Sequence, residues 1–203
     1  MKITIITVVL NDEVHIQKTI ESVINQSWRD LEYLIIDGGS TDHTLSIIEK
    51  FRSKIQYLIS EPDSGIYDAM NKGIRLANGK FTHFMNSGDT FDNPQVIHQI
   101  FSTIKSPKGI IYGDTRYQYP DGNTRIVRAH SEENIWKPFF NHQAAFFQTD
   151  ILKETGFNSL YRPASDFHLV MKSRSDGIEL QYIPKIINTF LIGGDIYQQE
   201  FKT

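Results

Sequence analysis

The strongest constraint on the fold of this chain is a regular alternation of apolar runs and amphipathic stretches over residues 1–90. Between the apolar runs, hydrophobic residues recur at spacings of three and four, which is typical of the buried face of a helix. Strands that alternate with helices over short connections favour a parallel sheet. We therefore expect an α/β fold with a mostly parallel central sheet flanked by helices. The expected strands are 3–9, 31–36, 55–59 and 81–85, and the expected helices include 16–27, 45–51 and 66–77.

Polar residues next to these stretches predict where the helices begin. Asn11 or Asp12 is expected to cap the first helix. The second helix should be capped by one of the polar residues at 40–42. Pro94 is typical of a first helical position and predicts a helix over 94–104.

The second half of the chain has a different pattern. The aromatic-rich run 109–119 predicts a long strand, and the turn residues 120–123 predict an antiparallel return over 124–128. We therefore expect residues 91–203 to add a small antiparallel element. The other expected elements are strands at 144–147 and 186–192, a helix from Thr149 or Asp150 to Gly156, and a helix from Ser165 or Asp166 to near Gly177.

Length and composition narrow the functional classes. A chain of 203 residues can bury one sizeable core, so we expect a single domain over 1–203. With 21 basic and 24 acidic residues it lacks the positive charge that non-specific nucleic-acid binding needs. It contains no cysteine, which excludes disulfides, thiolate zinc sites and a cysteine nucleophile.

The first ten residues are similar to a signal peptide, with one lysine before an apolar run. A polar segment, 11–13, follows directly without a small-residue cleavage site, so a buried strand is the favoured interpretation. No stretch approaches the ~20 apolar residues that span a bilayer. We expect a cytoplasmic protein, and contact with the inner face of a membrane stays open.

Carboxylates follow two of the expected strands. Asp37 comes directly after 31–36, and Asp89 follows 81–85 within the turn Asn86-Ser87-Gly88-Asp89. In open α/β sheets ligands bind outside the carboxyl ends of the strands. Asp37 could accept a hydrogen bond from a base or a ribose, and Asp89 could bind a hard cation together with substrate phosphates. By itself Asp37 is more typical of a turn, and Asp89 of a turn or a helix cap, but together, at the ends of two strands of one sheet, they favour a functional site.

Three further residues are weaker candidates. Asp166 lies at an expected helix start, where a capping carboxylate is the simpler interpretation and a general base the functional one. Lys72 could approach a phosphate, although a single lysine on a helix usually faces solvent. His142 precedes an apolar strand and is the histidine of most interest, although a core or solvated histidine is the more common case.

Several common motifs are absent from the sequence. It has no GxGxxG after the first strand, no GxxxxGK[ST] phosphate loop, no GxSxG elbow and no HExxH pair. These absences disfavour a dinucleotide-binding Rossmann enzyme, a P-loop NTPase, an α/β-hydrolase and a dedicated zinc site.

The ordered motifs resemble those of family-two glycosyltransferases of the GT-A fold, especially small bacterial enzymes that build surface polysaccharides. The segment 6–11 is similar to the family's first strand, and 37–44 is similar to its Asp-x-Gly-Ser-x-Asp-x-Thr loop. The segment 65–79 resembles its Ala-x-Asn-x-Gly helix, and 86–89 occupies its Asp-x-Asp position. The resemblance covers nearly the whole chain.

The resemblance implies a role for each matching residue. Val9, Asn11, Asp37 and Gly65 would contact the base and ribose of a nucleotide-sugar donor, with uracil the expected base, and Asn86 lies in the same donor segment. Asp89 would hold Mn²⁺ or Mg²⁺ on the diphosphate. Asp166 falls where the family keeps the carboxylate that activates the acceptor, a carbohydrate or a lipid-linked carbohydrate. The halves 1–90 and 91–203 would then bind donor and acceptor respectively.

One departure from the family pattern keeps other functions open. Ser87 stands where the first carboxylate of Asp-x-Asp is expected, so Asp89 would hold the cation with weaker help, and a non-catalytic carbohydrate-binding relative remains an alternative. A sugar-nucleotide nucleotidyltransferase is a second alternative. It would want a glycine-rich, arginine-containing loop after the first strand, whereas 10–13 is acidic.

Overall fold

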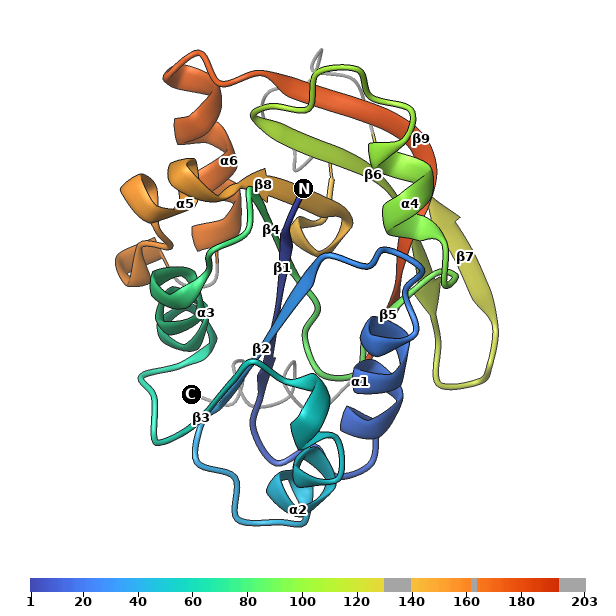
Figure 1. Ribbon diagram of the computed structural model, residues 1–203, viewed down its shortest axis with the longest axis vertical. Coiled ribbons are helices and arrows are strands. Elements are labelled where there is room, and N and C mark those ends of the chain that lie inside the picture. Colours follow the sequence, from blue (N-terminus) through green and yellow to red (C-terminus); the bar gives the residue numbers. More distant parts are fainter. Residues whose placement is uncertain (130–139, 162–163, 194–203) are drawn as a thin grey trace.

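The computed structural model describes residues 1–129, 140–161 and 164–193. Over these residues one nine-stranded sheet runs through the molecule in the order β3-β2-β1-β4-β8-β6-β9-β5, with β7 paired to β6 (Figure 1). The strands of the first half form one side of this sheet and those of the second half the other, and the pairing of β4 with β8 joins them, so the two halves of the chain share one sheet.

The four strands of the first half are parallel, as the sequence predicted. The strand β1 lies between β2 and β4, and β3 pairs with the outer side of β2. The helices of this half connect them in turn. The elements are β1 (Ile3–Val9), α1 (Ile16–Ile24), β2 (Leu31–Asp37), α2 (Thr44–Glu49), the 3₁₀ turn η1 (Arg52–Lys54), β3 (Tyr57–Ser60), α3 (Ile66–Leu76) and β4 (Phe81–Phe84).

The second half adds the expected antiparallel element. The strand β8 pairs antiparallel with both β4 and β6, β7 returns antiparallel along β6, and β9 runs parallel to β6 and antiparallel to β5. The elements are β5 (Thr90–Phe91), α4 (Val96–Phe101), β6 (Ile110–Gln118), β7 (Thr124–Val127), η2 (His142–Ala144), β8 (Ala145–Gln148), α5 (Thr149–Thr155), η3 (Ser159–Tyr161), α6 (Ser165–Ser175) and β9 (Leu180–Leu191).

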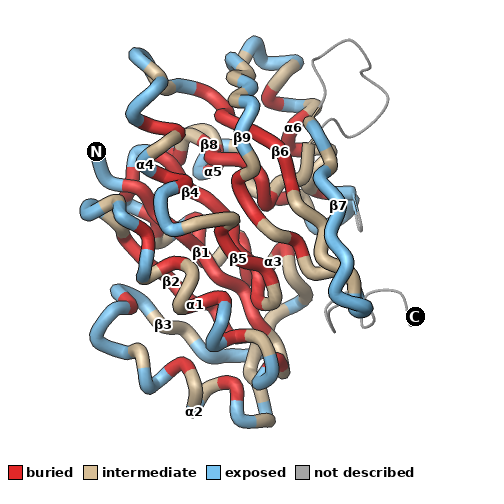
Figure 2. Tube along the Cα trace, turned by 90° about the vertical axis from the view of Figure 1, so that its right-hand side faces the viewer, coloured by how far each residue is buried: buried red, intermediate tan, exposed pale blue. Residues whose placement is uncertain are grey.

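Helices cover both faces of the sheet. Side chains alternate across a strand, so Ile3 and Ile5 of β1 pack with α1, α2 and α4, while Ile6 and Val8 pack with α3, α5 and α6. The central strands are buried along most of their length, and exposure is concentrated on the outer helices, β3 and β7 (Figure 2). Gly73 brings α3 close to the sheet, because a Cβ there would lie 2.6 Å from Cγ2 of Ile6.

The expected cap of the first helix and the expected start of the helix at Pro94 are wrong. The first helix begins at Ile16, and Asp12 lies in the turn before it, where its carboxylate accepts the His15 N–H at 3.2 Å. The helix expected from Pro94 begins at Val96, because the Asn93 side chain accepts the backbone N–H of Gln95 at 2.9 Å and forms a turn first. In both cases a local side-chain hydrogen bond competes with the first helical turn.

The ends of three other elements also differ from expectation. The helix α2 ends at Glu49, although Phe51 still packs against the core. Pairing of β3 begins at Tyr57 rather than at 55. The strand β9 extends back to Leu180. The sequence did not predict its first half, because these residues are exposed or partly exposed and lack the continuous apolar run of a fully buried strand.

Among the described residues, no helix is long and apolar enough to cross a membrane.

Candidate functional site

The first three strands end side by side at one edge of the sheet. The strand register places Val9 next to Asp37, and Asp37 next to Ser60. Backbone pairing between β1 and the fourth strand continues past Phe84, since the Ser87 N–H donates to the Val8 carbonyl at 3.1 Å. Val9, Asp37 and the turn after β4 therefore meet at the carboxyl ends of parallel strands, where α/β sheets bind ligands.

Asp37 is completely buried at this edge. Its carboxylate accepts hydrogen bonds from the Ser60 hydroxyl at 2.6 Å, from the Ser40 N–H at 3.1 Å and from the Ser40 hydroxyl. A carboxylate has about four acceptor positions, so Asp37 is held in one orientation with capacity for a further donor. The contact of Asp37 with a nucleotide base stays a prediction. Sequence reasoning missed Ser60, whose place at the end of the next strand was the available signal.

Asn11 connects the loops that follow β1 and β2. Its backbone N–H donates to the Ser40 hydroxyl at 2.8 Å, and its side-chain oxygen accepts the Thr41 N–H at 2.8 Å. Asn11 has a φ of 49°, a left-handed conformation that asparagine tolerates better than most residues. Its side chain therefore shapes the edge on which Asp37 lies.

The loop before α3 reaches the same edge. The Asp63 carboxylate accepts the Gly65 N–H at 2.8 Å, and a Cβ on Gly38 would lie 2.6 Å from the other Asp63 oxygen. Gly38 thus lets the loop after β3 approach the loop after β2. Lys72 binds the Glu61 carboxylate at 2.9 Å, so it braces this loop.

Asp89 is buried at the turn after β4, with 3% of its surface exposed. One oxygen accepts the Leu191 N–H of β9 at 3.1 Å, and the Asp89 carbonyl accepts the Thr19 hydroxyl of α1 at 2.8 Å. Burial raises the pKa of Asp89 well above its ordinary value, the Leu191 N–H opposes this shift, and the nearby charge of Asp12 adds to it. A positive charge beside Asp89 would therefore stabilise the ionised form of its carboxyl group.

Asp12 is a second buried carboxylate beside this turn, and sequence reasoning treated it only as a helix cap. Its oxygens contact the Ser87 hydroxyl at 2.6 Å and the His15 Nδ1 at 2.6 Å, and 5% of the residue is exposed. Ser87, which stands where a carboxylate was expected, thus donates a hydrogen bond to Asp12, an acidic residue that follows β1. An acidic residue directly after β1 was the signal available in the sequence.

The oxygen atoms of this turn suit a hard cation. The side-chain oxygen of Asn86 is buried and has no hydrogen-bond partner within the described ranges, and Asp89 supplies a carboxylate. The part of the chain that the structure describes contains no group of three or more His, Cys, Asp or Glu residues that could hold a metal ion. Asn86 and Asp89 supply two oxygen ligands of the type that Mn²⁺ and Mg²⁺ take, and a cation there would need its remaining ligands from substrate phosphates, so the metal site stays a prediction.

Asp166 lies in the first turn of α6, where three elements meet. Its carboxylate contacts His142 Nδ1 of η2 at 3.0 Å, the Phe167 N–H at 2.8 Å and, more distantly, the Tyr67 hydroxyl of α3 at 3.4 Å. Burial acts to raise the pKa of Asp166, but His142, Phe167 and Tyr67 together hold it below its ordinary value. Asp166 is therefore ionised near neutral pH, as a base must be.

The predicted residues form one connected edge and one separate group. Register and hydrogen bonds join Val9, Asn11 and Asp37, while Asn86 and Asp89 follow on the next strand. Asp166 contacts the donor side through the hydroxyl of Tyr67, two residues after Gly65. Within the described residues, no hydrogen bond or ion pair joins Asp166 to Asp89.

A family model and individual relatives that match this sequence all indicate the same kind of protein. Residues 4–168 match the family model for glycosyl transferase family 2. An uncharacterised glycosyltransferase of Mycobacterium tuberculosis is 30% identical over 178 residues, which cover 84% of this chain and 68% of that protein. A PGL/p-HBAD biosynthesis glycosyltransferase of Mycobacterium bovis is 30% identical over 81% of this chain and 66% of its own length. The chain thus spans about two thirds of these relatives.

Solved structures share the fold. TarS of Staphylococcus aureus in complex with UDP-GlcNAc has a TM-score of 0.77 at 20% identity, over 94% of this chain and 58% of TarS. The mannosyltransferase PcManGT of Pyrobaculum calidifontis, in complex with GDP-Man and Mn²⁺, has a TM-score of 0.75 at 18% identity, over 95% and 57% of the two chains. At these identities the matches establish the fold.

Proposed function

The chain belongs to glycosyl transferase family 2, and on that premise we propose that it transfers a sugar from a nucleotide-diphosphate donor to an acceptor hydroxyl. The observation that carries this proposal is the row of buried polar groups at the carboxyl ends of β1, β2 and β4. Solved relatives of the same fold hold UDP-GlcNAc or GDP-Man. We expect a UDP-sugar as donor, and polysaccharide or lipopolysaccharide synthesis as the process.

The donor half of the proposal is residues 1–90. Asp37 accepts a hydrogen bond from the base, Val9, Asn11 and Gly65 line the base and ribose, and Asn86 and Asp89 face the diphosphate. A divalent cation held by Asp89 and Asn86 would supply positive charge to the leaving diphosphate. Residues 91–203 then bind a carbohydrate or lipid-linked carbohydrate acceptor.

The acceptor hydroxyl needs a base to take its proton, and the ionised carboxylate of Asp166 can act as that base. As the acceptor oxygen attacks the anomeric carbon, Asp166 takes the proton of that hydroxyl, and the bond between the anomeric carbon and the phosphate oxygen breaks. The nucleoside diphosphate leaves with the electron pair of that bond. Attack from the face opposite the leaving group inverts the anomeric configuration.

The test is product analysis with a matched pair of variants. Wild-type protein is incubated with UDP-sugars, Mn²⁺ and a panel of saccharide acceptors, and proton NMR reports the anomeric configuration of the product. Asp166→Asn should lower turnover by ~10²–10⁴-fold and leave donor binding intact, because general base catalysis is typically worth that factor. Asp150→Asn is the control, since Asp150 is an exposed acid in the first turn of α5.

Two results would contradict the proposal. A product that keeps the anomeric configuration of the donor excludes direct displacement, and normal turnover by Asp166→Asn excludes Asp166 as the base. Release of pyrophosphate from a nucleoside triphosphate would favour the nucleotidyltransferase alternative. Donor binding with no hydrolysis or transfer in any mixture would favour a carbohydrate-binding relative.

A further inference from the structure

His142 is the partner of Asp166 that the proposed mechanism does not yet use. We infer that His142 is a positioning residue, which fixes the Asp166 carboxylate so that one acceptor position on Oδ2 stays open for the acceptor hydroxyl. This inference rests on the proposed function and assigns a role to a residue outside the Asp-x-Asp and base motifs.

The hydrogen bond between the two side chains has a definite direction. An ionised carboxylate can only accept, so at 3.0 Å His142 Nδ1 carries the hydrogen and donates it to Asp166 Oδ2. The other ring nitrogen, Nε2, is buried and has no hydrogen-bond partner within the described ranges. The bond to Asp166 therefore identifies Nδ1 as the ring nitrogen that faces the carboxylate and carries a hydrogen.

The acceptor positions of Asp166 show which oxygen remains available. Oδ1 is contacted by both the Phe167 N–H and the Tyr67 hydroxyl, whereas Oδ2 is contacted by His142. With about two lone-pair positions on each oxygen, Oδ2 keeps one. The His142 bond thus sets the rotation of the carboxylate and leaves Oδ2 as the atom that takes the proton.

His142 is well anchored for such a role. It begins η2, whose turn is closed by the Ala144 N–H on the Asn141 carbonyl at 2.8 Å, and it leads into the central strand β8. The following residues Ala144 and Ala145 are fully buried. The ring also packs edge-on against Phe157 with centroids 6.4 Å apart. A donor on such a support needs little reorganisation during the reaction.

The exposed fractions of the two side chains favour Asp166, rather than His142, as the group that takes the proton. The side chain of Asp166 is 32% exposed and that of His142 is 11% exposed. The unpartnered Nε2 of His142 is itself buried. An acceptor hydroxyl can therefore approach the carboxylate more readily than the imidazole, and His142 acts through Asp166.

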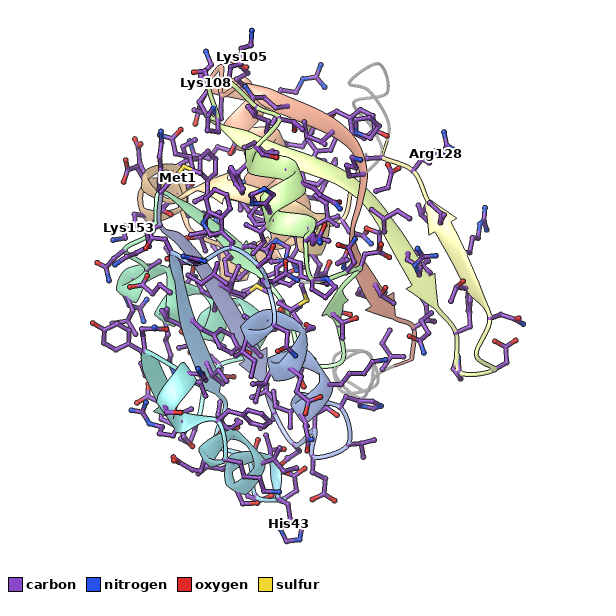
Figure 3. The ribbon with its side chains drawn as sticks, turned by 45° about the vertical axis from the view of Figure 1, so that its right-hand side comes forward. Met1, His43, Lys105, Lys108, Arg128 and Lys153 are labelled. Atoms are coloured by element: carbon purple, nitrogen blue, oxygen red, sulfur yellow. The ribbon has the colours of Figure 1, made fainter. Side chains whose placement is uncertain are left out.

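The test compares His142→Asn with His142→Ala. The amide nitrogen of asparagine is as many bonds from Cβ as Nδ1, so His142→Asn can keep the hydrogen bond to Asp166. His142→Ala should lower kcat by ~10²-fold, the effect of misplacing a catalytic group by about 1 Å, with an unchanged donor dissociation constant. His142→Asn should recover most of that loss. His43→Asn is the control, because His43 projects into solvent next to α2 (Figure 3).

Turnover is measured as UDP release from UDP-GlcNAc, UDP-glucose and UDP-galactose with Mn²⁺, and donor binding by calorimetry with UDP. Folding of each variant is checked by thermal melting. Normal kcat in a folded His142→Ala protein, or equal loss in both variants, overturns the inference. Absence of turnover in the wild type refutes the proposed function and with it this role.

A readout independent of turnover separates failure of the positioning role of His142 from failure of the proposed function. Long-range ¹H–¹⁵N spectra of histidine rings report which nitrogen carries the hydrogen. We expect His142 to carry it on Nδ1 in the wild type and to change to Nε2, the more common tautomer, in Asp166→Ala. A wild-type His142 ring with its hydrogen on Nε2 would overturn the inference even if sugar transfer were intact.

Discussion

The pH dependence of the unfolding free energy tests whether His83 is buried in its neutral form at the centre of the sheet. Its side chain is completely buried between Phe91 and Phe146, with ring centroids 4.9 and 4.5 Å away. Burial lowers the pKa of His83 to about 3, opposed by its hydrogen bond to the Ala145 carbonyl and aided by the charge of His142. The perturbation we consider is His83→Phe, which keeps an aromatic ring and removes the titration.

The sign and size follow from the two pKa values. Above the unfolded pKa of about 6.5 both states hold His83 neutral, so it contributes no pH dependence. As the pH falls below 6.5 the unfolded chain binds a proton that the folded chain refuses until about pH 3, so the folded state loses stability. The loss from this one group is about 1 kcal/mol at pH 5.5 and about 3 kcal/mol at pH 4.5.

The assay is urea unfolding of wild type and His83→Phe at several pH values from 7 to 4.5. At pH 7 the two should differ by about 1 kcal/mol, since the variant loses the hydrogen bond to Ala145. On acidification the wild type should lose about 3 kcal/mol more than the variant by pH 4.5. A difference in unfolding free energy that stays constant over this range would refute the assignment of His83 as a buried neutral group.

Two further predictions concern the packing of β1 against its neighbours. Gly79→Ala should destabilise the fold by roughly 3 kcal/mol in urea unfolding, because the new Cβ would lie 2.5 Å from the backbone nitrogen of Thr4; Gly122→Ala, with no neighbour within 4 Å, should cost only about 1 kcal/mol for its positive φ. Glu32→Gln should destabilise by about 1–3 kcal/mol at pH 7. Burial acts to raise the pKa of Glu32, but hydrogen bonds from Thr4 and Asn78 and the charge of Lys2 lower it overall, so the difference should shrink as the pH falls below the unfolded pKa of about 4.3; a difference that grows on acidification would contradict this.

Local rules recovered the parallel half of the fold because its strands are buried on both faces. The strands β1 and β4 are buried at every residue and β2 at every residue after Leu31, and β-branched and aromatic side chains are frequent in all three. Local rules could not place β8 between β4 and β6, since that depends on contacts between residues far apart in the chain. The first half of β9 is partly exposed and gave no continuous apolar signal.

The candidate site was predictable where one residue type at a strand end has a clear chemistry. Asp37 and Asp89 were found in this way, and both are buried at the expected edge. Ser60 and Asp12 were missed as site residues because their relevance depends on which strand ends meet. The bond between His142 and Asp166 spans 24 residues and joins η2 to α6, so no local pattern could reveal it.

The central claim is that the edge carrying Asp37 and Asp89 binds a nucleoside diphosphate. Calorimetric titration of UDP, in parallel with Mn²⁺ and with EDTA, tests it most directly, using wild type, Asp37→Asn, Asp89→Ala and the control Asp150→Asn. We predict saturable binding that needs Mn²⁺ and weakens by about tenfold or more in the first two variants, a loss of about 1.4 kcal/mol or more. Equal UDP affinity in all four proteins, or no binding of UDP to the wild type, would contradict the account.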